Sequence, residues 1–559
     1  MTFFSTHFLS VKRNLCKFVH QLFIKMSKKK TNTPLKANAR TTKHVKSKTP
    51  RKPFLIPVLP ALFVAVWAWV TFYYGDVFRI TRENSFWVSD TREMNFILNQ
   101  DYGIIRYVGR MLLMLFRYPW LGGLCLAFMA TLCTWFTSII FGFKSRWRWI
   151  SLLPVGIYLL SICYAGLNIY FERETGMVLG IPVTIVAILG ILALLRWLFS
   201  RTNVLKLLFI PDDESPLGNR LQLLGIIVIV GLSIGYVQWK QPYVRVINKM
   251  IRQTIEQDWY GVEETARAHA DMSNRPMAAF YAVALVHTNQ IADRLYDIRL
   301  DYDTLNVTGW DKTYNNGNSI YISDCSYHGG FVQTAYHNCM ERAVMSGFTI
   351  HGMEIMTKCA LMRNEWELAN KYLRILRDVP FEGQFYKKYK KMVYNAELVN
   401  SDPEMAHIRL LEPIHDSFES VYQQPVFLGY NLRLYEGRSV NALYNSLAVC
   451  LYTKVMPDFM SRLEPIAGQT PPENIMDGIL LMSNKNPNLL KAFNGLDFRM
   501  NRLSNYMNEI KPYMADRPGN ARKLFNKYKG YYPYYYFFGN LRATKKREPE
   551  TSTSSSGVN

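Results

Sequence analysis

Long uncharged runs, separated by short charged segments, constrain the fold of this chain more than any other feature of its sequence. Between Lys52 and Lys240 these runs are 19 to 26 residues long. They are Pro53–Gly75, Tyr118–Phe143, Trp149–Phe171, Thr175–Leu195 and Leu221–Trp239. A helix rises about 1.5 Å per residue, so about 20 residues cross the roughly 30 Å hydrocarbon core of a membrane. Helices buried in a large soluble core are the alternative, but they usually carry charge within two turns. The sequence therefore predicts five membrane-spanning helices.

The net charge of +23 is concentrated in an N-terminal arm. Residues 1–53 contain 14 Lys or Arg and no Asp or Glu, which leaves +9 for the other 506 residues. A basic arm beside a first span favours retention in the cytoplasm and contact with anionic lipid, so we predict no nucleic-acid partner. The arm, residues 1–52, has too little apolar surface to fold and is predicted to be disordered. Met26 is as good a candidate for the initiator methionine as Met1.

The charges between the runs predict an orientation. With the arm inside, residues 144–148 and 196–220 are also inside, and the loops 76–117 and 172–174 are outside. The inside segments carry 21 Lys or Arg, against 7 in the outside loops, as the positive-inside rule requires. Residues 240–559 are then outside. We expect a bacterial inner-membrane protein whose C-terminal region is periplasmic.

Beyond the five-span block (residues 53–239), residues 240–541 read as paired helices. The predicted pairs are Met277–His287 with Ile291–Asp297, Met353–Leu361 with Trp366–Leu376, Tyr394–Val399 with Met405–Leu411, and Asn441–Tyr452 with Asp458–Leu463. Ala369, Leu373 and Pro380 sit roughly where a tetratricopeptide (TPR) hairpin has a small residue, an apolar residue and a proline. No constant 34-residue period exists, so we predict an irregular TPR-like array. The predicted fold class is all-α, with a short strand at Ser319–Ile322 and a disordered tail at 542–559.

The 42-residue loop at 76–117 holds the candidate catalytic residues. Asp90, Glu93 and Asp101 could provide a general base or bind a metal, as carboxylates do in membrane glycosyltransferases that use lipid-phosphate donors. Arg106 and Arg110 could then contact the phosphate. The simpler interpretation is a set of solvated charges. Apolar residues at helical spacing from 104 to 115 also predict a helix lying in the membrane interface.

Cys325, His328, His337 and Cys339 are the candidate metal ligands. Zinc accepts these residue types, but their spacing matches no common finger or ribbon. A disulfide between the two cysteines is an alternative, and buried thiols with surface imidazoles are the simpler one. We predict no cofactor, because the chain has no GxxxxGK[ST], GxSxG, HExxH or kinase motif. The tyrosine-rich segment 525–538 is interpreted as aromatic packing, with glycan stacking or lipid headgroup contact as alternatives.

Several short motifs resemble a "domain of unknown function" family of multi-span bacterial membrane proteins. These motifs are Tyr102–Arg110, Phe116–Pro119, Gly122-Gly123, Asp258-Trp259, Ala284-Leu285, Ala292–Leu295, Asn338, Glu341, Ala369–Leu373, Phe525 and Lys527-Tyr528. The resemblance implies membrane helices followed by a helical periplasmic region. It implies no established activity and no catalytic residues.

These features favour an envelope protein whose helical array binds a protein or a glycan-handling partner. Helical hairpin arrays present extended binding surfaces, and no catalytic signature is present. The alternative is a membrane glycosyl- or phosphoglycosyl-transferase that uses the loop carboxylates. A transporter component is the third and least favoured hypothesis. No uncharged run contains the ionisable residue typical of ion coupling.

Overall fold

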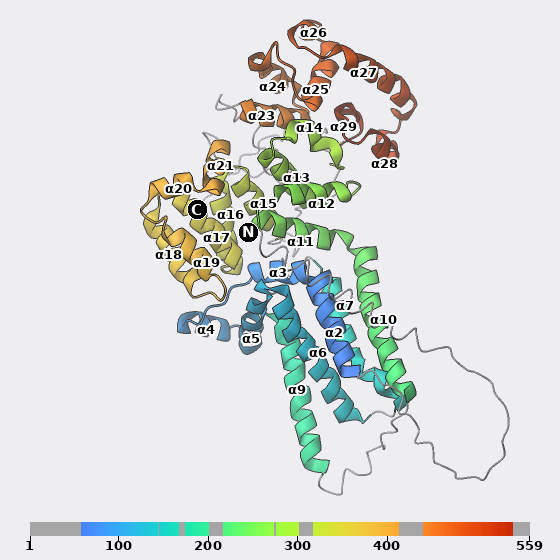
Figure 1. The fold of residues 1–559 in the computed structure, drawn as a ribbon, viewed down its shortest axis with the longest axis vertical. Helices are drawn as coiled ribbons and strands as arrows, with labels where there is room; N and C mark the ends of the chain where they lie inside the picture. Colours follow the sequence, from blue (N-terminus) through green and yellow to red (C-terminus); the bar gives the residue numbers. More distant parts are fainter. Residues whose placement is uncertain are drawn as a thin grey trace, which may run out of the picture. The chain divides into compact units, whose positions relative to one another are not determined.

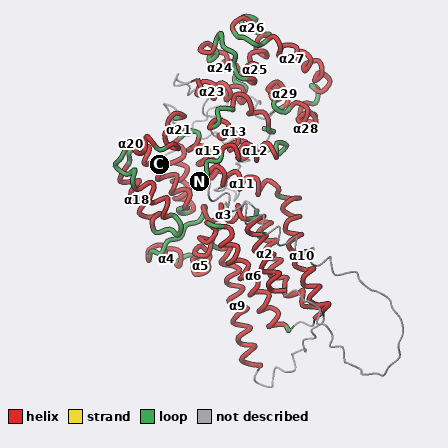
Figure 2. Tube along the Cα trace, viewed as in Figure 1, coloured by secondary structure: helices red, strands yellow, loops and turns green. Residues whose placement is uncertain are grey.

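The computed structural model describes residues 58–142, 145–166, 174–200, 216–272, 275–300, 317–412 and 440–539. Every regular element in these ranges is a helix (Figures 1 and 2), which confirms the all-α class for the described residues. The predicted basic arm and C-terminal tail lie outside these ranges.

Four helices are long and apolar enough to cross a membrane. They are α6 (Pro119–Phe141), α7 (Leu153–Ala165) with part of the preceding 3-10 helix η3 (Ser145–Leu152), α9 (Met177–Ser200) and α10 (Pro216–Lys240). A fifth span is present if the bent pair Val58–Tyr73 and Gly75–Glu83 is counted as one. The helices α2 (Val58–Ala68), α6, α9 and α10 pack alongside one another (Figure 1). The chain therefore has four to five helices that fit the predicted membrane block.

The first apolar helix ends in a sharp break. Its last turn is a π-helix, η1 (Trp69–Tyr73), and α3 (Gly75–Glu83) leaves it at an angle of 68°. Gly75 is required here, because a Cβ at this position would lie 2.9 Å from the carbonyl oxygen of Val70. After α3, the predicted outside loop forms α4 (Thr91–Leu98), α5 (Gly103–Leu113) and η2 (Met114–Arg117). The loop is therefore largely helical, and its second half packs against α9.

The rest of the described chain is a series of shorter helices. These are α11 (Pro242–Ile255), α12 (Trp259–Ala268), α13 (Arg275–His287), α14 (Ile291–Arg294), η5 (Leu295–Asp297), α15 (Gly317–His328), α16 (Val332–Ser346), α17 (Ile350–Met362), α18 (Trp366–Arg377), α19 (Gly383–Lys390), α20 (Ala396–Ser401), α21 (Pro403–Leu411), α23 (Val440–Thr453), α24 (Met456–Ser461), η7 (Glu464–Ile466), α25 (Glu473–Ser483), α26 (Leu489–Ala492), α27 (Asp497–Ile510), η8 (Lys511–Tyr513), α28 (Arg517–Tyr528) and α29 (Tyr532–Phe538). The predicted strand at Ser319–Ile322 is wrong, since these residues belong to α15. Packing of α15 against both α13 and α16 outweighs the local preference of its isoleucines for a strand.

Five of the connections between helices share one turn geometry. Their left-handed residues are Gln257, Asn289, Gly330, Asn364 and Lys454, with φ of 58°, 58°, 91°, 60° and 59°. The N–H of the next residue bonds a carbonyl five positions back in each case, as from Glu365 to Ala360 at 2.9 Å. This 6→1 bond is the mark of the Schellman motif, which ends one helix and turns the chain into the next. The turns are unevenly spaced along the chain, so the hairpins recur without a fixed period.

Two large apolar cores hold the shorter helices together. One is built mainly from α11–α14 and α23–α25, and the other from α15–α21. The segment that follows α3 enters the second core through Phe86 and Val88. The tyrosine-rich end is packed as predicted, since Tyr531, Tyr532 and Tyr535 are at most 3% exposed.

Candidate functional site

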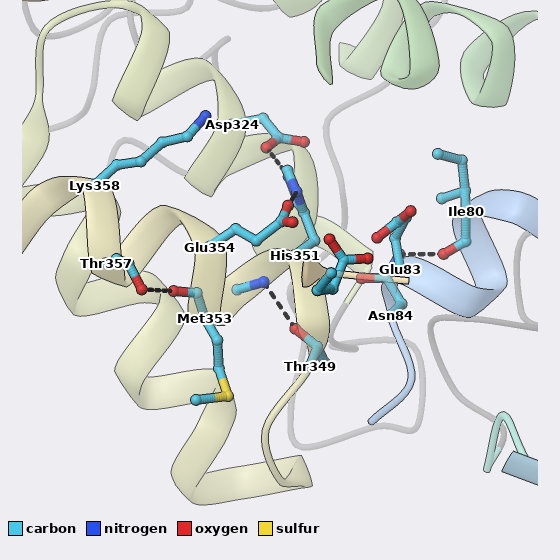
Figure 3. Close-up of polar contacts among 12 residues, drawn as sticks. Ile80, Glu83, Asn84, Asp324, Thr349, His351, Met353, Glu354, Thr357 and Lys358 are labelled. Atoms are coloured by element: carbon cyan, nitrogen blue, oxygen red, sulfur yellow. Dashed lines mark hydrogen bonds and ion pairs between the residues drawn. The ribbon is translucent and has the colours of Figure 1, made fainter. Parts of the chain in front are cut away.

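The most unusual feature of the described residues is a group of buried charges where α3 meets the shorter helices. We call it the charge cluster. It comprises Arg82, Glu83, Arg117, Asp324, His351, Glu354 and Glu382. Figure 3 shows Glu83 at the end of α3 beside His351 and Glu354 at the start of α17. An isolated charge is costly to bury, so the ion pairs and hydrogen bonds within the cluster determine which role it can have.

Arg82 is the centre of the first half of the cluster. Its side chain is fully buried, and its Nη1 lies 2.6 Å from Glu382 Oε1 and 3.0 Å from Glu83 Oε2. Its Nη2 donates to the carbonyl oxygen of Pro380 at 2.8 Å. Arg117 Nη1 contacts the other oxygen of Glu83 at 3.0 Å. These contacts tie α3 and η2 to the segment between α18 and α19.

His351 is the centre of the second half. Its Nε2 bonds Asp324 on α15, and its Nδ1 lies 3.7 Å from Glu354 Oε2. Burial lowers the pKa of His351, but Asp324 and Glu354 outweigh burial and raise it to about 10. Both ring nitrogens face carboxylates and carry protons at neutral pH. The imidazole is therefore a cation that joins α15 to α17, and it is unsuited to act as a general base.

The cluster holds more carboxylates than cations. Arg82, Arg117 and protonated His351 face four carboxyl groups, those of Glu83, Asp324, Glu354 and Glu382. Burial and then the charge of Glu354 raise the pKa of Glu382 to about 7, although both arginines oppose the shift. Protonation of Glu382 near neutral pH therefore relieves the excess negative charge.

The two helix ends that meet at the cluster are capped by side chains. Asn84 Nδ2 donates to the carbonyl oxygen of Ile80 at 2.8 Å, and its Oδ1 accepts from Arg342 Nη1 at 2.9 Å. Thr349 Oγ1 accepts from the N–H of Gly352 at 3.1 Å and caps the start of α17. The N–H of Ile350 then bonds the carbonyl oxygen of Ser85 at 3.0 Å. The bond from Ile350 to Ser85 and the bond from Arg342 to Asn84 thus join the two ends.

The cavity described beside the charge cluster is too small for a substrate. The cavity beside His351, lined by Cys339, Arg342 and Thr349 among others, has a volume of about 10 Å³. That is space for about one water molecule, whereas ligand pockets usually measure about 300–1,000 Å³. The geometry fits a structural joint between α3 and the shorter helices.

The predicted loop carboxylates are not among the ion-paired residues of this joint. Asp90 caps α4 by accepting from the N–H of Arg92 at 3.2 Å, and Asp101 is exposed. Burial raises the pKa of Glu93, and Arg110 opposes the shift. Arg110 Nε pairs with Glu174 at 2.6 Å, and Arg106 Nη1 donates to Gln100 at 2.7 Å. Both arginines therefore have partners within the chain, and a catalytic role for this loop stays a prediction.

The four predicted metal ligands lie in different surroundings and differ in burial. Cys325 and Cys339 are buried free thiols that belong to different apolar cores. Burial raises the pKa of Cys339 to about 12, which disfavours the thiolate that zinc needs. His337 is exposed, whereas His328 is buried near His287. No group of three or more His, Cys, Asp or Glu within the described ranges is arranged to hold a metal.

The sequence contained little sign of the charge cluster. Arg82 follows Phe78 by four residues, so it continues the apolar face of α3, and a charge on such a face can indicate a buried partner. That partner, Glu382, could not be found from spacing, because the two residues lie in distant parts of the sequence.

Comparison with known proteins identifies the family. The profile of DUF6057, described as a family of unknown function, matches residues 247–539, which is more than half of the chain. The chain is a member of DUF6057. The DUF6057 match begins within α11 and ends just after α29, so it includes Asp324, His351 and Glu382 but not Arg82 or the apolar helices. No curated protein and no solved structure matches the chain.

Proposed function

We propose that this DUF6057 member is a membrane-anchored docking protein whose shorter helices bind a protein partner. The four to five apolar helices provide the anchor, and the charge cluster joins them to the region that carries the docking surface. The repeated hairpin turn supports a TPR-like array. The positive-inside pattern supports an inner-membrane location with the docking region in the periplasm.

The observation that carries this proposal is the exposure of Phe498 near the start of α27. We call the surface of residues 497–530 the docking face. Of the 14 residues of α27, only Tyr506 and Ile510 are buried. Phe498 is 86% exposed, and Met500, Met507 and Tyr513 are also exposed. Exposed aromatic and methionine side chains among charged residues are typical of protein-binding surfaces.

The charge of the docking face indicates the chemistry of its partner. Residues 497–530 contain eight Lys or Arg and three Asp or Glu. The complementary surface is therefore acidic, with an apolar centre that receives Phe498. A protein partner is favoured over a glycan, because most of the tyrosines that would stack on a sugar are buried in the packed end of the chain, namely Tyr531, Tyr532, Tyr534 and Tyr535.

The test replaces Phe498 by glutamate in the full-length chain. We expect Phe498→Glu to lose most of the protein that co-purifies with the tagged wild-type chain after cross-linking in native membranes, because it puts a charge into the apolar contact. Quantitative mass spectrometry measures the loss. Val344→Glu is the matched control, since Val344 is 81% exposed but lies on α16.

The proposal requires Phe498→Glu to lose a partner that Val344→Glu retains, at equal levels of membrane-inserted protein. If both variants retain the same proteins, the partner does not bind the docking face.

A further inference from the structure

A second feature, separate from the charge cluster and the docking face, lies where the first apolar helix breaks and the last one ends. A cavity of about 320 Å³ is lined there by Tyr73 and Gly75 at the break, by Gln238 near the end of α10, and by Arg245 and Lys249 on α11. Its volume falls in the range of small-molecule sites. None of the residues that form the charge cluster lines it.

The break in the first helix fixes Arg245 in the cavity wall. Arg245 Nε donates to the carbonyl oxygen of Tyr73 at 2.9 Å, and its guanidinium carbon lies 3.9 Å from the centre of the Tyr73 ring. Stacking and hydrogen bonding together orient the guanidinium group. The group is thus positioned before any ligand arrives.

The cavity wall carries a net positive charge. Asp76 is the only carboxylate among the lining residues, and Arg252 Nε pairs with it at 2.8 Å. Lys249 is exposed. Within the described part of the chain, neither Arg245 nor Lys249 has an ion-pair partner. Two uncompensated cations on one wall select an anionic ligand.

The surroundings of the cavity place that anion at the membrane surface. Phe72, at the end of the first apolar helix, is 51% exposed, and Trp239, at the end of α10, is 76% exposed. Exposed aromatic residues at helix ends mark the depth of the lipid headgroups. A basic pocket between membrane helices at this depth has the chemistry of a headgroup site.

We propose that this cavity binds the phosphate of a membrane phospholipid, with Arg245 and Lys249 as its cationic contacts. The guanidinium group offers paired N–H donors that match two phosphate oxygens, and the ammonium group of Lys249 adds a mobile charge at the rim. The acyl chains extend along the apolar helices. Phospholipids of both leaflets carry a phosphodiester, so the proposal is independent of the orientation of the chain.

The experiment measures the thermal stability of the full-length protein in detergent as lipid is added. The probes are phosphatidylglycerol, diacylglycerol with the same acyl chains, and glycerol phosphate. We expect phosphatidylglycerol to raise Tm at concentrations where the other two do not, because ligand binding to the folded state stabilises it.

The variant Lys249→Gln tests the site itself. We expect about fivefold weaker stabilisation by phosphatidylglycerol, because a charge-assisted contact is lost. Lys240→Gln is the matched control, since Lys240 lies over Trp239 at the same helix end but does not line the cavity. Arg245→Gln should weaken binding further. If Arg245→Gln does not fold, Lys249→Gln decides the test alone.

Three results would overturn the proposal. Equal stabilisation by diacylglycerol would mean that only acyl chains bind. Equal stabilisation by glycerol phosphate would identify a soluble phosphate as the ligand. Unchanged lipid binding by Lys249→Gln would place the lipid elsewhere on the protein.

Discussion

At the scale of single residues, Glu382 and His351 show how one buried environment shifts two groups in the same direction. Glu354 repels a negative charge on Glu382 and attracts a positive charge on His351, so it raises both pKa values. A raised folded-state pKa means that the folded chain holds a proton which the unfolded chain releases. The stabilisation from each group is therefore complete below its unfolded pKa and is lost as the pH rises through its folded pKa.

This linkage gives a pH prediction for Glu382. Its pKa rises from 4.5 to about 7, so its stabilising effect should decline between those values as the pH increases. Glu382→Gln keeps an uncharged side chain at every pH. We expect the free energy of unfolding of this variant, relative to wild type, to increase by about 2 kcal/mol between pH 5 and pH 8. Denaturant unfolding of the full-length protein across this range measures the difference.

Glu397→Gln is the control, because Glu397 is an exposed carboxylate on α20. It should follow the wild-type pH profile. If Glu382→Gln also follows that profile, Glu382 is already ionised at pH 5 and the excess charge of the cluster is relieved elsewhere.

At the scale of elements, periodicity predicts helices well and their connections poorly. The apolar spacing predicted α17 and α18 to within a few residues, because each buries one face against a neighbour. The strand prediction at Ser319–Ile322 failed, because contacts on both sides of α15 outweigh local preference. The shared hairpin turn was not anticipated, since its left-handed position is filled by Gln, Asn, Gly and Lys in different copies.

The turn at Asn364 provides a test at this scale. Asn364 has φ of 60°, a conformation that asparagine and glycine adopt more easily than β-branched residues. We expect Asn364→Val to lower the free energy of unfolding by about 1–2 kcal/mol and Asn364→Gly to change it little. Thermal unfolding followed by circular dichroism measures both variants. Equal losses in the two would show that the asparagine side chain, rather than the backbone conformation, stabilises the turn.

At the scale of the whole molecule, local composition predicted the apolar helices but not what joins them to the rest of the chain. Each apolar run can be recognised from its own residues alone. The hydrogen bond from Arg82 to Pro380, in contrast, links positions 298 residues apart. The sequence led instead to Asp90, Glu93 and Asp101 as candidate site residues, because an acidic loop is visible locally. Only the folded chain brings the members of the charge cluster together.

The orientation of the membrane helices is a prediction for the whole molecule. Ser89 is exposed between α3 and α4, and the cysteines in the described ranges are buried or half-buried. We expect Ser89→Cys to react with a membrane-impermeant maleimide in spheroplasts, because the positive-inside pattern puts its loop outside. Ser47→Cys, in the basic arm, should react only after lysis. The opposite pattern would invert the orientation and move the docking face to the cytoplasm.

The separation of Arg82 from Glu382 also sets an order for biosynthesis. Arg82 leaves the ribosome 298 residues before Pro380, so the first apolar helices are complete while Pro380 and Glu382, two of the three partners of this arginine, are still untranslated. Until then its guanidinium group has only Glu83 as a partner and must stay partly hydrated, because a charge with too few partners is costly to bury. Docking of α3 is thus a late step of assembly. A chain that terminates early would leave Arg82 with Glu83 as its only partner among the three, in a form that quality-control proteases could distinguish from the finished protein.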